Sequence, residues 1–155
     1  MRKYFQTYQS PIGEMYLYEE DDFITKLVYR KTSGDGFQEK ETPLLKETIK
    51  QLQEYFDGKR KTFKVPLNLK GTDFQKQVWN ALLNIPYAET RSYKDIAEAI
   101  GNPKASRAIG LANNRNPISI IIPCHRVIGA NGSLTGYAGG LSAKQTLLDI
   151  EKQYK

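Results

Sequence analysis

The chain contains one cysteine and one histidine, and they are neighbours in the sequence, Cys124 and His125. A thiol reacts as its thiolate, and an adjacent imidazole is the usual group that takes the proton or stabilises the charge. The pair is therefore a candidate nucleophile site. A lone cysteine is more often buried as a small hydrophobic residue. Here the charged neighbour Arg126 argues against an inert core thiol.

The residues before the pair indicate how the thiol is positioned. Residues 118–122 are mainly isoleucine and predict a buried strand, which Pro123 must end because proline cannot donate to a sheet ladder. Cys124 should then lie just beyond the strand. Asn116 precedes this strand, and its amide is expected to brace the turn that holds the thiol.

A helix is predicted from Leu141 to Lys155, with Leu147, Leu148 and Ile150 facing inward. Glu151 lies one turn after the two leucines, on or beside the buried face. A buried carboxylate without a partner is costly, so Glu151 needs one. His125 is the one imidazole available to it.

Length and composition limit the class of protein. The 155 residues, of which 39% are hydrophobic, fit one domain or two small ones with a real core. No apolar run reaches the roughly 18 residues of a membrane span, and the first residues lack the apolar core of a secretory signal. One cysteine excludes an internal disulfide and suits a reducing cytoplasm, and with one histidine it argues against a zinc site.

The net charge of +6 is unevenly distributed. No Asp or Glu occurs from Ala99 to Leu148, whereas five basic residues do: Lys104, Arg107, Arg115, Arg126 and Lys144. An acid-free segment around the thiol is expected to attract a polyanion. A generally basic surface without a ligand would give the same count, so charge alone does not decide.

The N-terminal part predicts a small antiparallel meander over residues 1–30, because polar and apolar residues alternate there. Residues 31–40 are predicted as a loop. Thr42 and Pro43 then begin a helix that ends at Asp57-Gly58. Residues 63–69 read as a strand or a connecting segment, and the composition changes at 68–72.

The C-terminal part is predicted to be mostly helical. Thr72 or Asp73 begins a helix that Ile85-Pro86 ends. Two short helices over 92–100 and 104–112, joined by a turn at Gly101, have the layout of a helix-turn-helix. The second is rich in small residues, which lets a backbone approach phosphates closely. Such a hairpin is often only structural, so the layout alone leaves DNA binding open.

Several spaced motifs resemble the 6-O-alkylguanine-DNA alkyltransferases, also called methylated-DNA–protein-cysteine methyltransferases, over roughly 71–151. These motifs are Ile122-Pro123-Cys124-His125-Arg126-Val127, Gly71-Thr72-Asp73-Phe74-Gln75, Val78-Trp79, Ser92-Tyr93, Ala105-Ser106-Arg107-Ala108, Asn116-Pro117 and Tyr137-Ala138-Gly139-Gly140. The resemblance implies an α+β fold. A small antiparallel-sheet, ribonuclease H-like part over 1–70 would support a mostly helical part over 71–155 that contains the helix-turn-helix and the alkyl acceptor.

The resemblance also implies a reaction. Cys124 would attack the alkyl group of O6-alkylguanine in DNA and form a permanent thioether, so each chain would act once. His125 would draw the thiol proton through a water, with Glu151 orienting the imidazole. Asn116 would hold the turn, and Tyr93 would donate a hydrogen bond to the leaving guanine. No cofactor or metal is implied, and the cysteines and histidines with which some members bind zinc are absent.

A stacked base is out of reach of the thiol, so the nucleotide must flip out of the duplex. By resemblance Arg107 fills the vacated stack, and the second helix of the pair enters the minor groove. DNA contact is further assigned to Ala105, Ser106, Thr72, Arg115 and Tyr93. The substrate pocket is assigned to Val127, Tyr137, Ala138 and Ser119, with the carbonyls of Cys124 and Val127 selecting guanine through its exocyclic amine. The expected partner is double-stranded DNA of any sequence, bound by a monomer.

Two positions depart from some relatives. Ser119 stands where some have a proline, which leaves the grip on bulky alkyl groups open. Ala138 stands where some have a serine, which leaves its backbone N–H as the donor to O6.

Two other functions are compatible with parts of the sequence. A Cys-His hydrolase or peptidase would use the dyad with turnover, but it would leave the helix pair and the acid-free segment without a role. A DNA-binding regulator whose thiol senses oxidation would bind one defined sequence far more tightly than random duplex.

Overall fold

The computed structural model describes residues 2–31 and 36–155. The chain divides into two compact units, Met1–Leu69 and Lys70–Lys155, which are described separately. No helix in the described residues has the length and apolar character that crossing a membrane requires.

The first unit is built on a four-stranded sheet in the order β3-β2-β1-β4. Strands β1 (Lys3–Ser10), β2 (Gly13–Glu20) and β3 (Phe23–Val28) form the antiparallel meander that the alternating pattern predicts. β4 (Gln38–Glu39) pairs parallel with β1, so the sheet is mixed and not wholly antiparallel as predicted. β4 also lies within the predicted loop over 31–40, of which residues 32–35 are outside the described residues.

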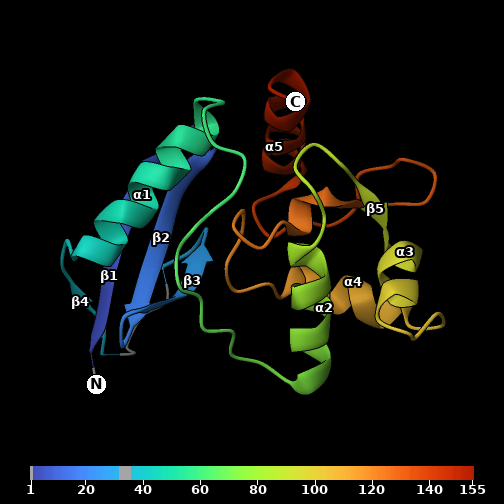
Figure 1. Cartoon of the computed structure of the whole chain (residues 1–155), viewed down its shortest axis with the longest axis horizontal. Helices are drawn as coiled ribbons and strands as arrows, with labels where there is room; N and C mark the ends of the chain where they lie inside the picture. The colour runs from blue at the N-terminus through green and yellow to red at the C-terminus, as the bar shows by residue number, and fades with distance from the viewer. Residues whose placement is uncertain (1, 32–35) are drawn as a thin grey trace. The chain divides into compact units, whose positions relative to one another are not determined.

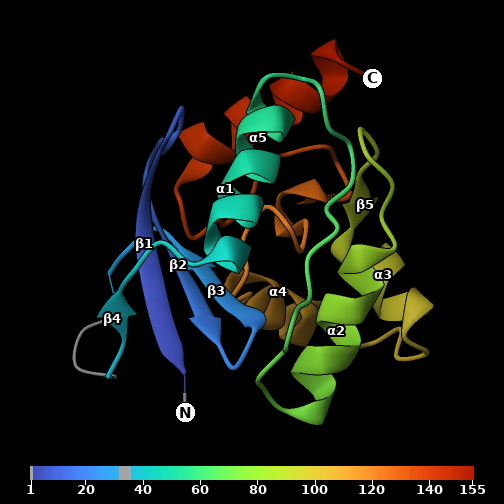
Figure 2. The ribbon, with the colours of Figure 1, turned by 60° about the vertical axis from the view of Figure 1, so that its left-hand side comes forward.

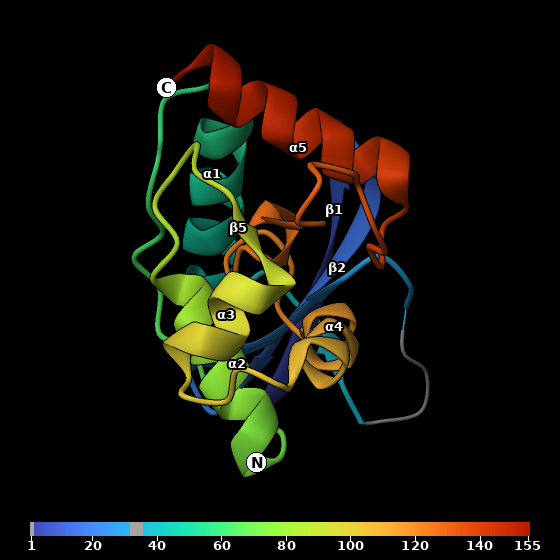
Figure 3. The same ribbon diagram turned by 90° about the vertical axis from the view of Figure 1, so that its right-hand side faces the viewer.

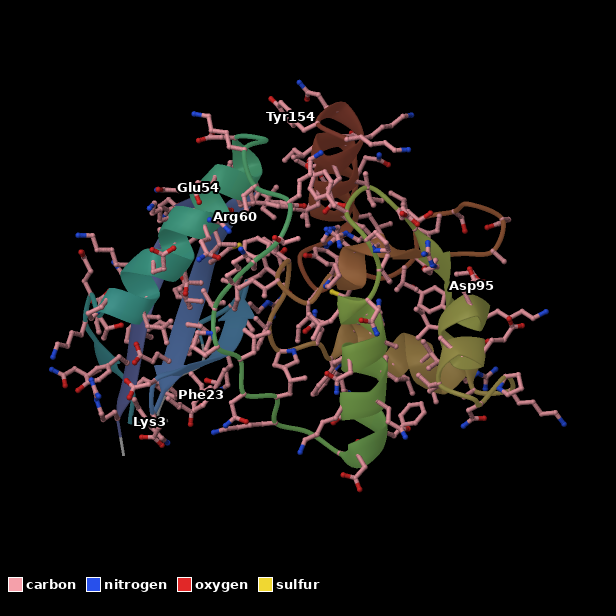
Figure 4. The ribbon with its side chains drawn as sticks, in the orientation of Figure 1. Lys3, Phe23, Glu54, Arg60, Asp95 and Tyr154 are labelled. Carbon is pink, nitrogen blue, oxygen red and sulfur yellow. The ribbon has the colours of Figure 1, made fainter. Side chains whose placement is uncertain are left out.

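Helix α1 (Pro43–Phe56) packs against β1, β2 and β3, and Figure 2 shows it running across the sheet. It begins where the sequence predicts, with the Thr42 side chain accepting a hydrogen bond from the Leu45 amide at 3.0 Å. Just beyond its last turn, Arg60 donates to Glu54 at 2.9 Å, and Figure 4 shows the two side chains together. Capping and burial of one face therefore fix the helix on the sheet.

The second unit is mostly helical, as predicted. It contains α2 (Asp73–Leu83), α3 (Tyr93–Ala99), α4 (Ser106–Asn114) and α5 (Leu141–Gln153), with two short parallel strands, β5 (Arg91–Ser92) and β6 (Val127–Ile128). α2 begins at Thr72 in a capping box with Gln75, and α3 begins at Ser92 in one with Asp95, which Figure 4 labels at the helix start. Figures 1 and 3 both show α5 at the opposite end of the unit from α4.

One predicted element is wrong. Residues 119–122 form turns and a bend, Ile118 makes only an isolated bridge, and Ile120 has a positive φ of 71°, so the segment is not a strand. Part of the backbone is satisfied within the segment, because the Ile122 amide donates to the Ile118 carbonyl at 3.0 Å and the Ile121 amide to the Ser119 carbonyl at 2.8 Å. Branched aliphatic residues are equally suited to a buried turn and to a buried strand, so their pattern does not distinguish the two.

Candidate active site

Cys124 opens a single turn of 3-10 helix, η1 (Cys124–Arg126), directly after the buried turns. The buried side chain of Asn116 closes those turns. Its Oδ1 accepts from the Ile118 amide at 2.9 Å, and its Nδ2 donates to the Ile122 carbonyl at 2.8 Å. The amide thus fixes both ends of the segment that delivers the thiol.

His125 is fully buried and is paired with Glu151 of α5. The His125 Nε2 and the Glu151 Oε2 lie 2.6 Å apart. A carboxylate can only accept, so Nε2 carries the proton and Nδ1 of the neutral ring carries the lone pair. Within the described part of the chain, that buried Nδ1 has no hydrogen-bond partner. The ring is therefore oriented as a base with its accepting nitrogen available.

Glu151 also binds Arg126 and the backbone. Arg126 Nε donates to Oε1 at 2.8 Å and Nη2 to Oε2 at 3.1 Å, while the Ala88 amide donates to Oε1 at 3.1 Å. Burial by itself raises the pKa of Glu151, but the hydrogen bonds from His125 and Arg126, together with the charge of Arg126, hold it at about 2. The carboxylate is therefore ionised throughout the physiological range.

The Cys124 thiol is buried, and burial raises its pKa to about 11. A hydrogen bond from Asn116 and the positive charge of Lys144 oppose the shift. Burial also lowers the pKa of His125, although the hydrogen bond to Glu151 and the charge of Glu151 act to raise it. Near neutral pH the resting pair is therefore a thiol beside a neutral imidazole, and the sulfur needs a base to become nucleophilic.

A buried lysine joins the segment after the thiol to the loop that precedes α5. Lys144 of α5 donates through Nζ to the Val127 carbonyl at 2.6 Å and to the Thr135 carbonyl at 2.8 Å. The Thr135 hydroxyl lies 2.6 Å from the Tyr93 hydroxyl, at the first residue of α3. Tyr93 and Val127 are thereby held in one network, and the parallel pairing of β5 with β6 supports the same placement.

The predicted pocket residues differ in exposure. Ser119, Val127 and Tyr137 are buried, whereas Ala138 is exposed. The Val127 carbonyl accepts from Lys144 and keeps a second lone pair for a ligand. The Cys124 carbonyl accepts a hydrogen bond from the Val127 amide and a second, long one of 3.4 Å from the Asn113 side-chain amide. A ligand that binds this carbonyl would replace the long hydrogen bond from Asn113, because it is the weaker of the two.

The predicted DNA-contact residues lie on or beside α4. Arg107, Ala108 and Leu111 are exposed, with Leu111 at 61%, while Ile109 and Ala112 face inward. Trp79 of α2 donates to the Ala112 carbonyl at 3.0 Å and holds this inner face. Ala105 and Ser106, at the start of the helix, are half-buried.

A groove of about 260 Å³ runs between α4 and the start of α2. It brings together Thr72 and Arg115, two of the predicted contact residues, with Phe74, Gln75 and Leu111. Arg107 is on the same helix but does not line this groove.

Three residues of the site were not predicted to take part: Arg126 on Glu151, Lys144 at the loop carbonyls and Thr135 on Tyr93. The first two were counted only as basic charge. One signal in the sequence could have identified Arg126. Glu151 was expected to be buried and to need a hydrogen-bonding or charged partner, and Arg126 meets that need as well as His125 does.

The arrangement suits proton removal from a thiol by an imidazole that a carboxylate orients. In the described residues, no three of His, Cys, Asp and Glu gather in a way that could hold a metal ion. The chemistry available to these side chains is nucleophilic attack by sulfur beside an exposed, basic helix.

Comparison with family models covers nearly the whole chain. Residues 3–69 match the model described as "6-O-methylguanine DNA methyltransferase, ribonuclease-like domain". Residues 73–153 match "6-O-methylguanine DNA methyltransferase, DNA binding domain".

Individual relatives agree with the models. The chain is 53% identical over 157 residues to the constitutive methylated-DNA–protein-cysteine methyltransferase of Bacillus subtilis, covering 96% of this chain and 95% of the relative. It is 52% identical over 153 residues to the methylated-DNA–protein-cysteine methyltransferase of Methanosarcina acetivorans, covering 96% and 97%. Its fold matches the Mycobacterium tuberculosis OGT solved in complex with DNA, with a TM-score of 0.92, 47% identity and coverage of 97% and 94%.

Proposed function

Because the chain belongs to the 6-O-methylguanine-DNA methyltransferase family, we propose that Cys124 is the residue that accepts the alkyl group from damaged DNA. The protein is a DNA-repair methyltransferase that acts on methylated DNA and uses its own cysteine as acceptor. The observation that carries the assignment is the buried His125–Glu151 pair, with the free Nδ1 of His125 on the residue next to the chain's one thiol.

The reaction follows from these groups. His125 Nδ1 takes the thiol proton, directly or through a water, and Glu151 stabilises the imidazolium that forms. The sulfur attacks the alkyl carbon, the bond from that carbon to O6 of guanine breaks, and its electron pair passes to the base. Tyr93 donates a hydrogen bond to the leaving guanine as charge builds on it. A thioether has no route back to the thiol in this site, so each chain reacts once.

The Cys124 thiol is buried, so the damaged nucleotide must leave the duplex to reach it. α4 supports this step with an exposed face that carries Arg107 among small residues, which suits entry into the minor groove. Thr72 and Arg115 are proposed to contact the DNA backbone at the groove between α2 and α4. Binding by such contacts is independent of sequence and weakens with salt.

The substrate pocket is proposed to lie beside Cys124. Val127, with its free carbonyl lone pair, reads the exocyclic amine, while Ser119, Tyr137 and the backbone N–H of Ala138 bound the pocket. The second unit carries the DNA and acceptor functions, and the first unit supports it. A thiol that must stay reduced fits the cytoplasm, which we propose as the location.

Replacing Arg107 with alanine is expected to slow methyl transfer from methylated duplex DNA by about 10-fold or more, since unstacking a base costs a few kcal/mol and the variant cannot fill the gap. Transfer from the free alkylated base, which needs no flipping, should be unchanged. Single-turnover assays on both substrates measure the two rates. Lys59→Ala, which removes another exposed positive charge, from the first unit, is the matched control. Equal slowing on both substrates would contradict a flipping role.

A further inference from the structure

Arg126 is a buried cation with no step assigned to it in the reaction above. Arg126 is 7% exposed, and its side chain contacts other residues of the second unit. Besides the two hydrogen bonds to Glu151, Nη1 donates to the Ile85 carbonyl at 2.7 Å, and the guanidinium carbon lies 5.7 Å from the centre of the Tyr87 ring. An arginine held by a carboxylate, a carbonyl and an aromatic ring cannot move away from Glu151.

Arg126 and His125 use the same carboxylate. Oε2 of Glu151 contacts His125 at 2.6 Å and Arg126 at 3.1 Å, and Oε1 contacts Arg126 at 2.8 Å. The guanidinium stays protonated at every pH at which proteins fold. The negative charge of Glu151 is therefore already balanced before His125 takes up a proton.

Protonating His125 would add an unbalanced positive charge to a buried site. Besides Arg126, the groups that face it are Glu151 and Lys144 from α5, and both cations oppose its protonation. Tyr87, beyond Arg126, adds only a neutral phenol at physiological pH. His125 thus shares its one carboxylate with Arg126 and also feels the charge of Lys144, and burial penalises a further positive charge on the ring.

We propose that Arg126 is a positioning residue that keeps the His125 imidazole uncharged in the resting protein, so that Nδ1 is available as a base and Cys124 remains a thiol until substrate arrives. The proposal rests on the proposed function, in which His125 is that base. Without Arg126, Glu151 would face the imidazole alone and favour an imidazolium beside a thiolate, the resting state of many reactive cysteines.

A resting thiol that is not ionised is an advantage because each chain can use its thiol only once. A resting thiolate reacts with any small electrophile, and a thioether formed that way would consume the chain without repairing DNA. A buried thiol beside a neutral base is activated only when the pocket is occupied. Arg126 would therefore protect an acceptor that cannot be regenerated.

The test uses the fact that the chain has one histidine and one cysteine, so each signal belongs to one residue. The His125 ring protons are followed by NMR from pH 4 to 9, and the rate of Cys124 alkylation by iodoacetamide is measured at pH 7. Arg126→Gln removes the charge and keeps donors for Glu151, whereas Arg126→Lys keeps the charge. Arg60→Gln makes the same change at an arginine of the first unit, where it pairs with Glu54 at 2.9 Å, and is the matched control.

In the unmodified protein, His125 should titrate below its ordinary pKa of about 6.5. Arg126→Gln should raise that pKa by about one or more, as loss of a like charge at contact distance does, and should speed alkylation about 10-fold. Arg126→Lys and Arg60→Gln should resemble the unmodified protein. An unchanged or lower His125 pKa in Arg126→Gln would overturn the proposal.

If Arg126→Gln does not fold, Arg126→Met, which has a side chain of similar length without charge, takes its place and should raise the His125 pKa in the same way. A His125 that titrates above about 6.5 in the unmodified protein is already charged in the resting state, and this result would also overturn the proposal. Methyl transfer from a methylated duplex is measured in parallel. Absence of transfer would refute the proposed function, while the His125 titration would still report on Arg126.

Discussion

Replacing Cys124 with serine is expected to reduce methyl transfer from methylated duplex DNA below detection, the largest effect of any single change in the chain. Serine has nearly the same shape, but its hydroxyl is not ionised by an imidazole without further activation, and an alkoxide is a poorer nucleophile than a thiolate toward saturated carbon. Transfer of a radioactive methyl group to protein, measured with the protein in excess, gives the result directly.

The control for this change is binding, because α4 and the groove at Thr72 and Arg115 do not involve the thiol. Affinity of Cys124→Ser for methylated duplex should remain within about 2-fold of the original, since no phosphate contact is lost. Methyl uptake by the serine variant at a measurable rate would mean that another residue accepts the group, and the site would have to be reassigned.

Replacing His125 with glutamine is expected to slow methyl transfer by about 10²- to 10⁴-fold, the range that a positioned general base provides. The glutamine amide can still donate to Glu151, so the buried carboxylate keeps its contacts and the fold is preserved. The single-turnover rate over a range of pH measures the loss, and circular dichroism verifies the fold.

The pH dependence of the rate distinguishes a base from a structural residue. Burial lowers the pKa of His125, so the rate of the unmodified protein should be constant at neutral pH and fall only when the pH drops below about 6.5 and the ring is protonated. In His125→Gln the rate should instead rise with pH toward about 11, where the buried thiol ionises unaided. A variant that keeps the original profile would contradict the role of His125 as the base.

Local signals in the sequence predicted most of the helices. Thr42 and Thr72 begin α1 and α2 as expected, because capping depends on side chains three residues apart. The predicted α+β class is confirmed by the structure and by the similar structures. Helix starts can be predicted in this way because they depend on neighbouring residues and not on what the helix packs against.

Features that depend on distant partners were missed or wrong. The parallel pairing of β4 with β1 follows from where the chain returns after residues 29–37, which strand propensity does not encode. The run of isoleucines over 118–122 predicted burial correctly but predicted a strand wrongly, since Asn116 satisfies that backbone from outside the run.

The charged members of the site show the same limit. Arg126 lies 25 residues from Glu151 and 41 from Ile85, and Lys144 lies 17 from Val127. A sequence does not distinguish a buried cation from an exposed one. The cost of burying the charge is offset by a partner that only the folded structure brings into contact. The adjacent Cys124 and His125, by contrast, were visible because the chain has no other cysteine or histidine.

The most direct test of the central claim is the intact mass of the protein after incubation with excess duplex that contains O6-methylguanine. We expect a gain of one methyl group per chain and no more, located on Cys124 by peptide mapping, with no further reaction after fresh DNA is added. More than one methyl released from DNA per chain, or a methyl group on any other residue, would contradict it.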